Sequence, residues 1–126
     1  SYGLQNEIVI TGMQKNPYPY MNVCDIYVQP SHYEAYSTTV TEARVLGRPI
    51  VTTDVGGMRD QLTDGENGLI VPIDAEAIAE AVKRLLTDGE LRSSFTKRLQ
   101  NEDFSPEKYL ETYEKTVFSE YIGGLI

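Results

Sequence analysis

Short apolar runs rich in β-branched residues alternate with segments of helical periodicity, and this alternation constrains the fold more than any other feature of the sequence. The runs cover residues 8–11, 25–29, 50–53 and 68–71, and Gly, Pro or Asp follows each one. Strands that alternate with helices are typical of a parallel sheet. We therefore predict an α/β fold with helices on both faces of a parallel sheet, as in Rossmann-like domains. The 126 residues have the length of a single domain, which we expect to cover 1–126.

The segments between and after these runs carry helix signals. Short helices are expected over 20–24 and 58–62. Asp74 and Asp88 each stand where they can cap a longer helix, and Ser105 followed by Pro106 begins a C-terminal helix over about 105–126. The apolar stripes of these helices are Ile78, Val82, Leu85 and Leu86; Leu91, Phe95 and Leu99; and Tyr109, Tyr113, Val117 and Tyr121.

Charge and cysteine content limit the classes of function. The formal net charge is −8, which argues against non-specific binding of nucleic acid or of anionic membranes, because both need basic patches. The single cysteine, Cys24, cannot form an intramolecular disulfide, which fits a reducing compartment. No apolar run approaches membrane-spanning length. Residues 1–6 lead almost directly into the first apolar run, so we expect the chain to be a segment of a longer protein; the alternative is a natural short domain that lacks only its first residue.

The segment from Ser37 to Leu46 has two interpretations. Its first five residues are hydroxylated or β-branched and favour a strand by propensity, whereas Glu42–Gly47 is typical of a helix end. Too little chain is present for both elements. We prefer a helix capped by Ser37 or Thr38, whose first backbone amides point into the preceding loop. Such amides form an anion site suited to a phosphate or diphosphate.

Two carboxylates frame this first turn. Glu34 lies in the loop before it, and Glu42 lies in the second turn, about 7 Å along the axis at about 1.5 Å per residue. With a diphosphate at the helix start, Glu34 is placed for a sugar hydroxyl and Glu42 for a ribose diol. From the residues alone a plainer interpretation is favoured, in which the first carboxylate is solvated and the second complements the helix dipole.

The order of motifs changes this balance. The chain reads P-S-x-x-E, then seven residues and E-A, then L-G-x-P-I-V and G-G, and later D-G-E-N-G-L-I-V-P-I-D. This succession resembles the E-x7-E signature of family 4 glycosyltransferases, and the likeness covers about residues 7–100. The resemblance implies the C-terminal donor-binding half of a GT-B fold and retaining transfer of a hexose from a nucleotide-diphosphate sugar. It also implies a role in the assembly of bacterial polysaccharides or other glycans.

The resemblance also implies roles for individual residues. Glu34 takes the position of the catalytic carboxylate that contacts the donor's sugar, and Glu42 that of the carboxylate that binds the ribose. Relatives more often have E-G-F-G where this chain has E-A-Y-S at 34–37, and the loss of both glycines changes which sugar fits. The remaining donor-binding positions place backbone near the diphosphate and sugar or line the nucleotide pocket: Tyr36, Ser37, Thr38, Thr39, Gly12 and Met13.

Cofactors and partners follow from the same resemblance. We expect no cofactor and no metal, because the sequence has neither an Asp-x-Asp motif nor metal-ligand spacing. The expected partners are the nucleotide-sugar donor and an N-terminal acceptor-binding domain, on which the 105–126 helix is expected to pack. No activity is expected from this chain alone, because relatives carry an Arg/Lys diphosphate clamp upstream. The expected location is cytoplasmic, at the inner membrane face in the parent protein. Two alternatives stay open: a sugar-nucleotide epimerase or phosphorylase relative, and a non-catalytic sugar-binding domain.

Overall fold

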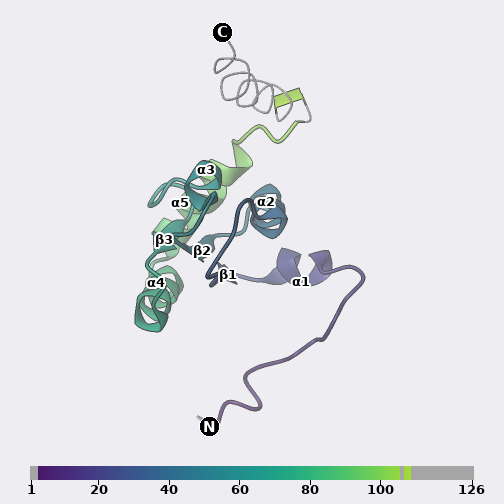
Figure 1. Ribbon diagram of the computed structural model, residues 1–126, viewed down its shortest axis with the longest axis vertical. Helices are drawn as coiled ribbons and strands as arrows, with labels where there is room; N and C mark the ends of the chain where they lie inside the picture. Colours follow the sequence, from purple (N-terminus) through teal and green to yellow (C-terminus); the bar gives the residue numbers. More distant parts are fainter. Residues whose placement is uncertain (1–2, 106, 109–126) are drawn as a thin grey trace.

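The computed structural model of the protein describes residues 3–105 and 107–108. Helices and strands alternate through this part of the chain (Figure 1). The sheet contains strands β1 (Tyr27–Gln29), β2 (Ile50–Thr53) and β3 (Leu69–Val71). The helices are α1 (Tyr18–Val23), α2 (Thr38–Val45), α3 (Met58–Gln61), α4 (Ala75–Thr87) and α5 (Gly89–Gln100).

The three strands are parallel and lie in the order β1-β2-β3. The register pairs Gln29 with Thr52, and Thr52 in turn with Ile70. All four residues of β2 are buried, as expected for the central strand of a sheet covered on both faces. Three of the four predicted strands are therefore present, and their parallel arrangement confirms the predicted fold class.

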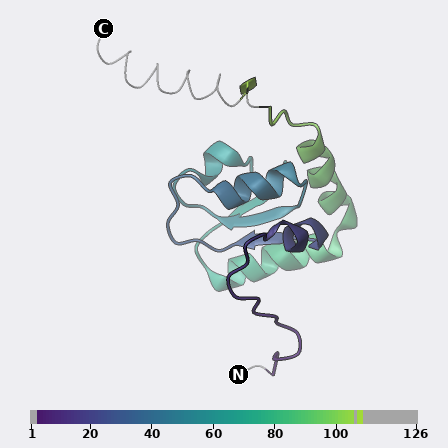
Figure 2. The same cartoon turned by 90° about the vertical axis from the view of Figure 1, so that its right-hand side faces the viewer.

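Helices cover the two faces of the sheet. Figure 2 shows the sheet between α2 on one side and α4 on the other. Neighbouring residues of β2 point to opposite faces, so Ile50 and Val51 belong to different cores. The core under α2 contains Met21, Val40, Ala43, Ile50, Met58, Leu62 and Ile70. The core under α4 and α5 contains Val51, Leu69, Ala81, Leu85 and Phe95.

The strand predicted over residues 8–11 is not formed. Ile8, Val9 and Ile10 are 60%, 82% and 91% exposed, and the segment from the N-terminus to α1 runs away from the sheet (Figure 1). β-branched residues favour strands only where a neighbouring strand supplies hydrogen-bond partners. In the described part of the chain, β1 pairs with β2 alone, and residues 8–11 pair with no strand.

The predicted helices are largely confirmed. Asp74 caps α4 by accepting from the Ala77 amide, and Asp88 caps α5 by accepting from the Leu91 amide. Leu86 was wrongly assigned to the buried stripe of α4: it is 59% exposed, because it lies about 100° around the helix from fully buried Leu85. Most of the helix predicted over 105–126, with its tyrosine stripe, lies outside the described residues.

A polar cluster fixes the chain just beyond α5. The carboxylate of Glu102 accepts hydrogen bonds from the Arg44 guanidinium at 2.7 Å and from Asn67 Nδ2 at 2.8 Å. Arg44 lies on α2, and its guanidinium also stacks 5.2 Å from the ring centroid of Phe104. This cluster connects α2, the turn before β3 and the C-terminal segment. No helix in the described residues is long and apolar enough to cross a membrane.

Candidate functional site

The predicted cap of α2 is confirmed at the carboxyl end of β1. Helix α2 begins at Thr38, and the Ser37 hydroxyl accepts from the Val40 amide at 3.1 Å. Helical rather than extended backbone therefore resolves the ambiguity of this segment. Within the described residues, the amides of Thr38 and Thr39 donate to no other group. These two N–H groups carry the partial positive charge of the helix start and are available to an anion.

The Ser37 amide, in contrast, is already occupied. It donates to Gln61 Oε1 at 2.9 Å, and Gln61 Nε2 donates back to the Ser37 carbonyl at 2.7 Å. The same Nε2 group donates to the Thr41 hydroxyl at 2.9 Å. Gln61 lies on α3 and is only 3% exposed, so its amide group braces the start of α2 from inside the protein. Sequence reasoning missed Gln61, because its contact with Ser37 joins residues 24 positions apart and no local pattern indicates it.

A second buried glutamine, Gln29, orients Glu34. Gln29 is the last residue of β1, and its Nε2 donates to Glu34 Oε1 at 3.1 Å and to the Ser37 hydroxyl at 2.8 Å. Its Oε1 accepts from the hydroxyls of Thr39 at 2.7 Å and Tyr27 at 2.9 Å. The four bonds use both ends of the amide and tie the strand, the loop and the helix cap together. Sequence reasoning missed Gln29 as well.

Burial is the main reason why the pKa of Tyr27 is raised, and the nearby carboxylates of Glu42 and Glu34 raise it further. The phenol therefore stays protonated and remains a donor to Gln29. The charges of Glu42 and Glu34 thus both act on the Tyr27 hydroxyl, which donates to Gln29 at the carboxyl end of β1.

The loop that carries Glu34 rests on two glycines. The Gly57 amide donates to the Glu34 carbonyl at 3.3 Å. A Cβ atom at Gly56 would lie 1.4 Å from the Glu34 carbonyl oxygen, and one at Gly57 would lie 2.1 Å from the carbonyl oxygen of Ala35. Gly56 also has a φ of +42°, in the left-handed region that favours glycine. The Gly-Gly pair after β2 thus allows the backbone of the Glu34 loop to pack directly against it.

Glu42 faces α1. Its Oε1 accepts from the Tyr18 hydroxyl at 3.0 Å, which leaves Oε2 available. This hydrogen bond, and then the charge of Glu42, raise the pKa of Tyr18. The contact links residues 24 positions apart and was not anticipated from the sequence.

The remaining residues predicted for the donor site do not all lie near Glu34 and Glu42. Thr38 and Thr39 are exposed at the helix start, and Tyr36 is 51% exposed, with its hydroxyl 3.5 Å from that of Thr41. Ala35 and Ser37 adopt negative φ, so this loop does not need the glycines that relatives have there. The structure does not bring Gly12 or Met13 to the site: Met13 is fully exposed on the N-terminal segment that runs away from the sheet (Figure 1). Their roles stay predictions.

Within the described part of the chain, Arg59 is already paired and no metal-binding group of side chains is present. Arg59 of α3 donates to both oxygens of Asp54 at 2.9 and 3.0 Å, and this contact lowers the pKa of Asp54. Its guanidinium is therefore already engaged. Among the described residues, no group of three or more His, Cys, Asp or Glu side chains is arranged to hold a metal ion.

Curated relatives of the chain are glycosyltransferases. A lipopolysaccharide core biosynthesis glycosyltransferase of Rhizobium meliloti is 32% identical over 97 residues, which cover 76% of this chain and 28% of that protein. An alpha-D-kanosaminyltransferase of Streptomyces kanamyceticus is 37% identical over 93 residues, covering 71% of this chain and 24% of that protein. The chain thus spans about a quarter of the length of these relatives.

Solved structures agree with the fold. The sucrose-phosphate synthase of Thermosynechococcus elongatus is 28% identical with a TM-score of 0.73, over 94% of this chain and 32% of that one. HepE of Anabaena, solved in complex with UDP, is 21% identical with a TM-score of 0.79, over 93% and 34% of the two chains. These likenesses confirm the relation to the GT-B fold. The family model of "Glycosyl transferases group 1" matches residues 1–102, and the chain therefore belongs to the group 1 glycosyl transferases.

Proposed function

We propose that this chain is the donor-binding domain of a retaining glycosyltransferase. It holds a nucleotide-diphosphate sugar along α2, for transfer of a hexose to a glycan or lipid-linked acceptor. One observation carries the proposal: the oriented Glu34 carboxylate lies in the loop that leads to α2, whose amides at Thr38 and Thr39 have no partner within the described residues. This loop follows the carboxyl end of β1, and ligands of parallel α/β sheets bind beyond the carboxyl ends of the strands.

The amides of Thr38 and Thr39 take the diphosphate, with support from the dipole of α2. No basic side chain is needed for this contact, which fits a chain with a net charge of −8.

The carboxylates hold the two ends of the donor. Glu42 accepts from the ribose hydroxyls through Oε2, since Tyr18 occupies Oε1. Glu34 accepts from a sugar hydroxyl through Oε2, since Gln29 occupies Oε1. In the transition state the anomeric carbon gains positive charge, which the fixed negative charge of Glu34 stabilises.

The UDP complex of the structural neighbour HepE supports a nucleotide ligand. The names of several relatives support polysaccharide synthesis, including a capsular polysaccharide glycosyltransferase of Staphylococcus aureus. The retaining outcome rests on the ordered E-x7-E motif at Glu34 and Glu42.

We further propose that the 126-residue chain alone does not turn over. A departing diphosphate needs strong charge compensation. In the described part of the chain, no Lys or Arg side chain bonds to a residue that frames the site. The acceptor-binding domain and further cations are therefore proposed to complete the enzyme.

Calorimetric titration of the chain with UDP, GDP and their hexose conjugates tests donor binding. We expect saturable binding of one nucleotide family, and Glu42→Gln should weaken it about tenfold or more, because a hydrogen bond to a charged group contributes about 1.5–3 kcal/mol. Glu80→Gln, on the exposed face of α4, is the matched control and should bind normally. Equal affinities of all three proteins would remove Glu42 from the site.

Transfer is tested in a chain that also carries the acceptor-binding domain. Glu34→Gln should lower kcat by about a hundredfold or more, in the range found when one electrostatic stabiliser is removed. Nuclear magnetic resonance of the first product should show that the anomeric configuration of the donor is kept. An inverted product would contradict the retaining assignment even if donor binding is confirmed.

A further inference from the structure

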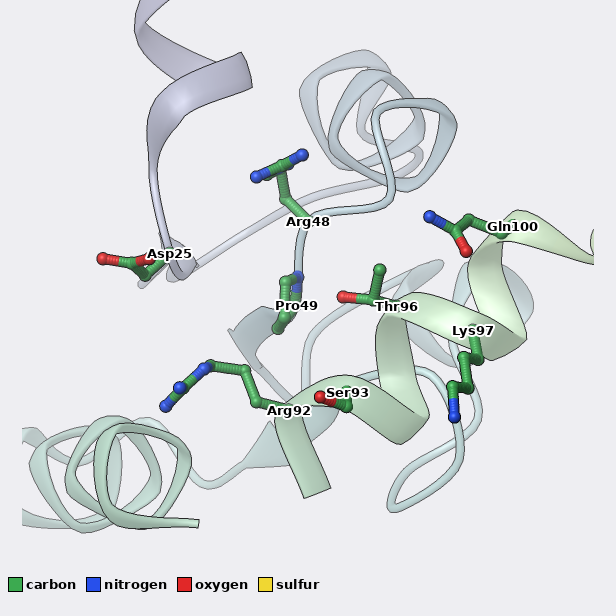
Figure 3. A pocket seen from close by; sticks show the side chains of 8 residues that line it. All are labelled: Asp25, Arg48, Pro49, Arg92, Ser93, Thr96, Lys97 and Gln100. Atoms are coloured by element: carbon green, nitrogen blue, oxygen red, sulfur yellow. The ribbon is translucent and has the colours of Figure 1, made fainter. Parts of the chain in front are cut away.

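A hollow of about 320 Å³ lies at the amino ends of the strands, at the opposite end of the sheet from Glu34. Asp25 and Pro49, which precede β1 and β2, form one wall, and α5 forms the other. The site of the proposed transfer follows the carboxyl ends of the strands, whereas this hollow adjoins their amino ends. The lining residues are Asp25, Arg48, Pro49, Arg92, Ser93, Thr96, Lys97 and Gln100 (Figure 3).

The hollow gathers positive charge on an acidic protein. Arg48, Arg92 and Lys97 carry three positive charges against one negative charge on Asp25, a local net charge of +2, whereas the whole chain has −8. Within the described residues, none of the three cations forms an ion pair; the ion pairs there use other arginines. Charges within a Debye length of about 8 Å dominate the field that a small ligand meets. The local field therefore favours an anion.

The two guanidinium groups are held in place by backbone carbonyls. Arg48 donates to the carbonyls of Leu46 and Cys24, each at 3.2 Å. Arg92 donates from Nη1 to the carbonyls of Leu85 at 2.7 Å and Leu86 at 3.2 Å. These bonds use Nε and Nη1 of Arg48 and Nη1 of Arg92, and Nη2 of each guanidinium has no partner among the described residues.

Figure 3 shows the two arginines on opposite sides of Pro49, with Thr96 beside Pro49 and Ser93 next to Arg92. The Thr96 hydroxyl donates to the Gly47 carbonyl at 3.2 Å, while the Ser93 hydroxyl makes no hydrogen bond within the described residues. The hollow is thus lined by two guanidinium groups held by carbonyls, the Ser93 hydroxyl and the Lys97 ammonium group. Guanidinium groups held in a fixed position are well suited to phosphate oxygens.

We propose that this hollow binds a phosphate or diphosphate group of a small molecule, at a site separate from the donor site. Its volume fits a small ligand rather than a polymer, and the acidic remainder of the surface disfavours nucleic acid. The inference does not depend on the proposed transfer reaction.

The test is calorimetric titration of the 126-residue chain with inorganic pyrophosphate at low ionic strength. Saturable binding is expected, weakened about tenfold by Arg48→Gln and by Arg92→Gln, the loss of one charge-assisted hydrogen bond. Arg84→Gln is the matched control, since Arg84 is an exposed arginine of α4 outside the hollow, and it should bind as the unchanged chain does.

A further variant covers the case in which loss of the Arg48 contacts disturbs folding. Ser93→Asp removes no hydrogen bond seen in the structure and adds a negative charge to the hollow, so it should also weaken binding while leaving thermal unfolding nearly unchanged. Pyrophosphate bound at the start of α2 would be insensitive to all three substitutions. Undiminished binding in these variants, or no saturable binding in the unchanged chain and no vesicle binding, overturns the proposal.

Vesicles distinguish the two sources of phosphate. Sedimentation with phosphatidylglycerol and with phosphatidylcholine vesicles should leave the chain in the supernatant, because its net charge of −8 opposes an anionic membrane. Sedimentation with phosphatidylglycerol that Arg48→Gln and Ser93→Asp abolish would assign the same site to a lipid headgroup. Sedimentation that these substitutions do not change, without pyrophosphate binding, would contradict the site.

Discussion

Substitution of Gly56 by Ala should damage the donor site more than the fold. The new Cβ would lie 1.4 Å from the Glu34 carbonyl oxygen, and ordinary contacts begin at about 3.4 Å, so the two backbone segments must separate by about 2.0 Å. Such a movement exceeds what the Gln29–Glu34 hydrogen bond of 3.1 Å can absorb. The substitution also places a side chain in left-handed backbone, at a cost of about 1–2 kcal/mol.

Gly65→Ala provides the matched control. Gly65 has a φ of +82° in a turn, and a Cβ atom there meets nothing within 4 Å. It therefore carries the backbone cost without the clash. Urea unfolding should show a loss of about 1–2 kcal/mol for Gly65→Ala and a larger loss for Gly56→Ala.

The nucleotide titration separates the two variants further. Gly65→Ala should bind as the unchanged chain does, whereas Gly56→Ala should lose about tenfold or more in affinity, the value of one hydrogen bond to a charged group. If both variants unfold at the same urea concentration and bind nucleotide equally, the Glu34 loop does not depend on close packing against Gly56. That result would refute the proposed role of this glycine.

Three further predictions concern the core residue Phe95, the hydrogen bonds between Gln61 and Ser37, and the titration of Tyr18. Phe95→Ala, at a fully buried position, should lower the free energy of unfolding by about 3–5 kcal/mol, measured by urea denaturation. Gln61→Leu should cost about 1–3 kcal/mol by leaving the buried Ser37 amide without its partner, and a loss below 0.5 kcal/mol would contradict the brace. In an ultraviolet titration of the phenols, Glu42→Gln should bring the pKa of Tyr18 back toward 10.0, because the bonded carboxylate raises it. Because the pKa of Tyr18 is raised in the folded protein, its bond to Glu42 stabilises the fold at lower pH, including pH 7. This stabilisation is lost as the pH rises through the raised pKa, above 10. An unchanged Tyr18 titration would contradict the contact.

The fold was predictable where one local pattern determines one element. Ser37, Asp74 and Asp88 cap helices because a side-chain oxygen before an apolar period satisfies the first amides wherever the helix lies. The failure at residues 8–11 has the opposite cause, since a strand depends on partners that lie elsewhere in the chain.

The candidate site was predictable only in part. The positions of Glu34 and Glu42 follow from motif order, but their hydrogen-bond partners do not. Gln29 and Gln61 act across elements, the latter over 24 residues, and no spacing rule reports such contacts. Whether an amide at the helix start is free depends on these distant side chains, as the occupied Ser37 amide demonstrates.

The cluster around Glu102 sets a lower limit for shortening this chain. A form that ends with α5 at Gln100 would keep α1–α5 and β1–β3 but would remove the Glu102 carboxylate and the Phe104 ring from the Arg44 guanidinium, whose side chain is 15% exposed in the full chain. Removal of one partner of a partly buried ion pair is destabilising, because the remaining charge loses its compensation. Deletion series should therefore lose stability once Glu102, two residues past the end of α5, is removed.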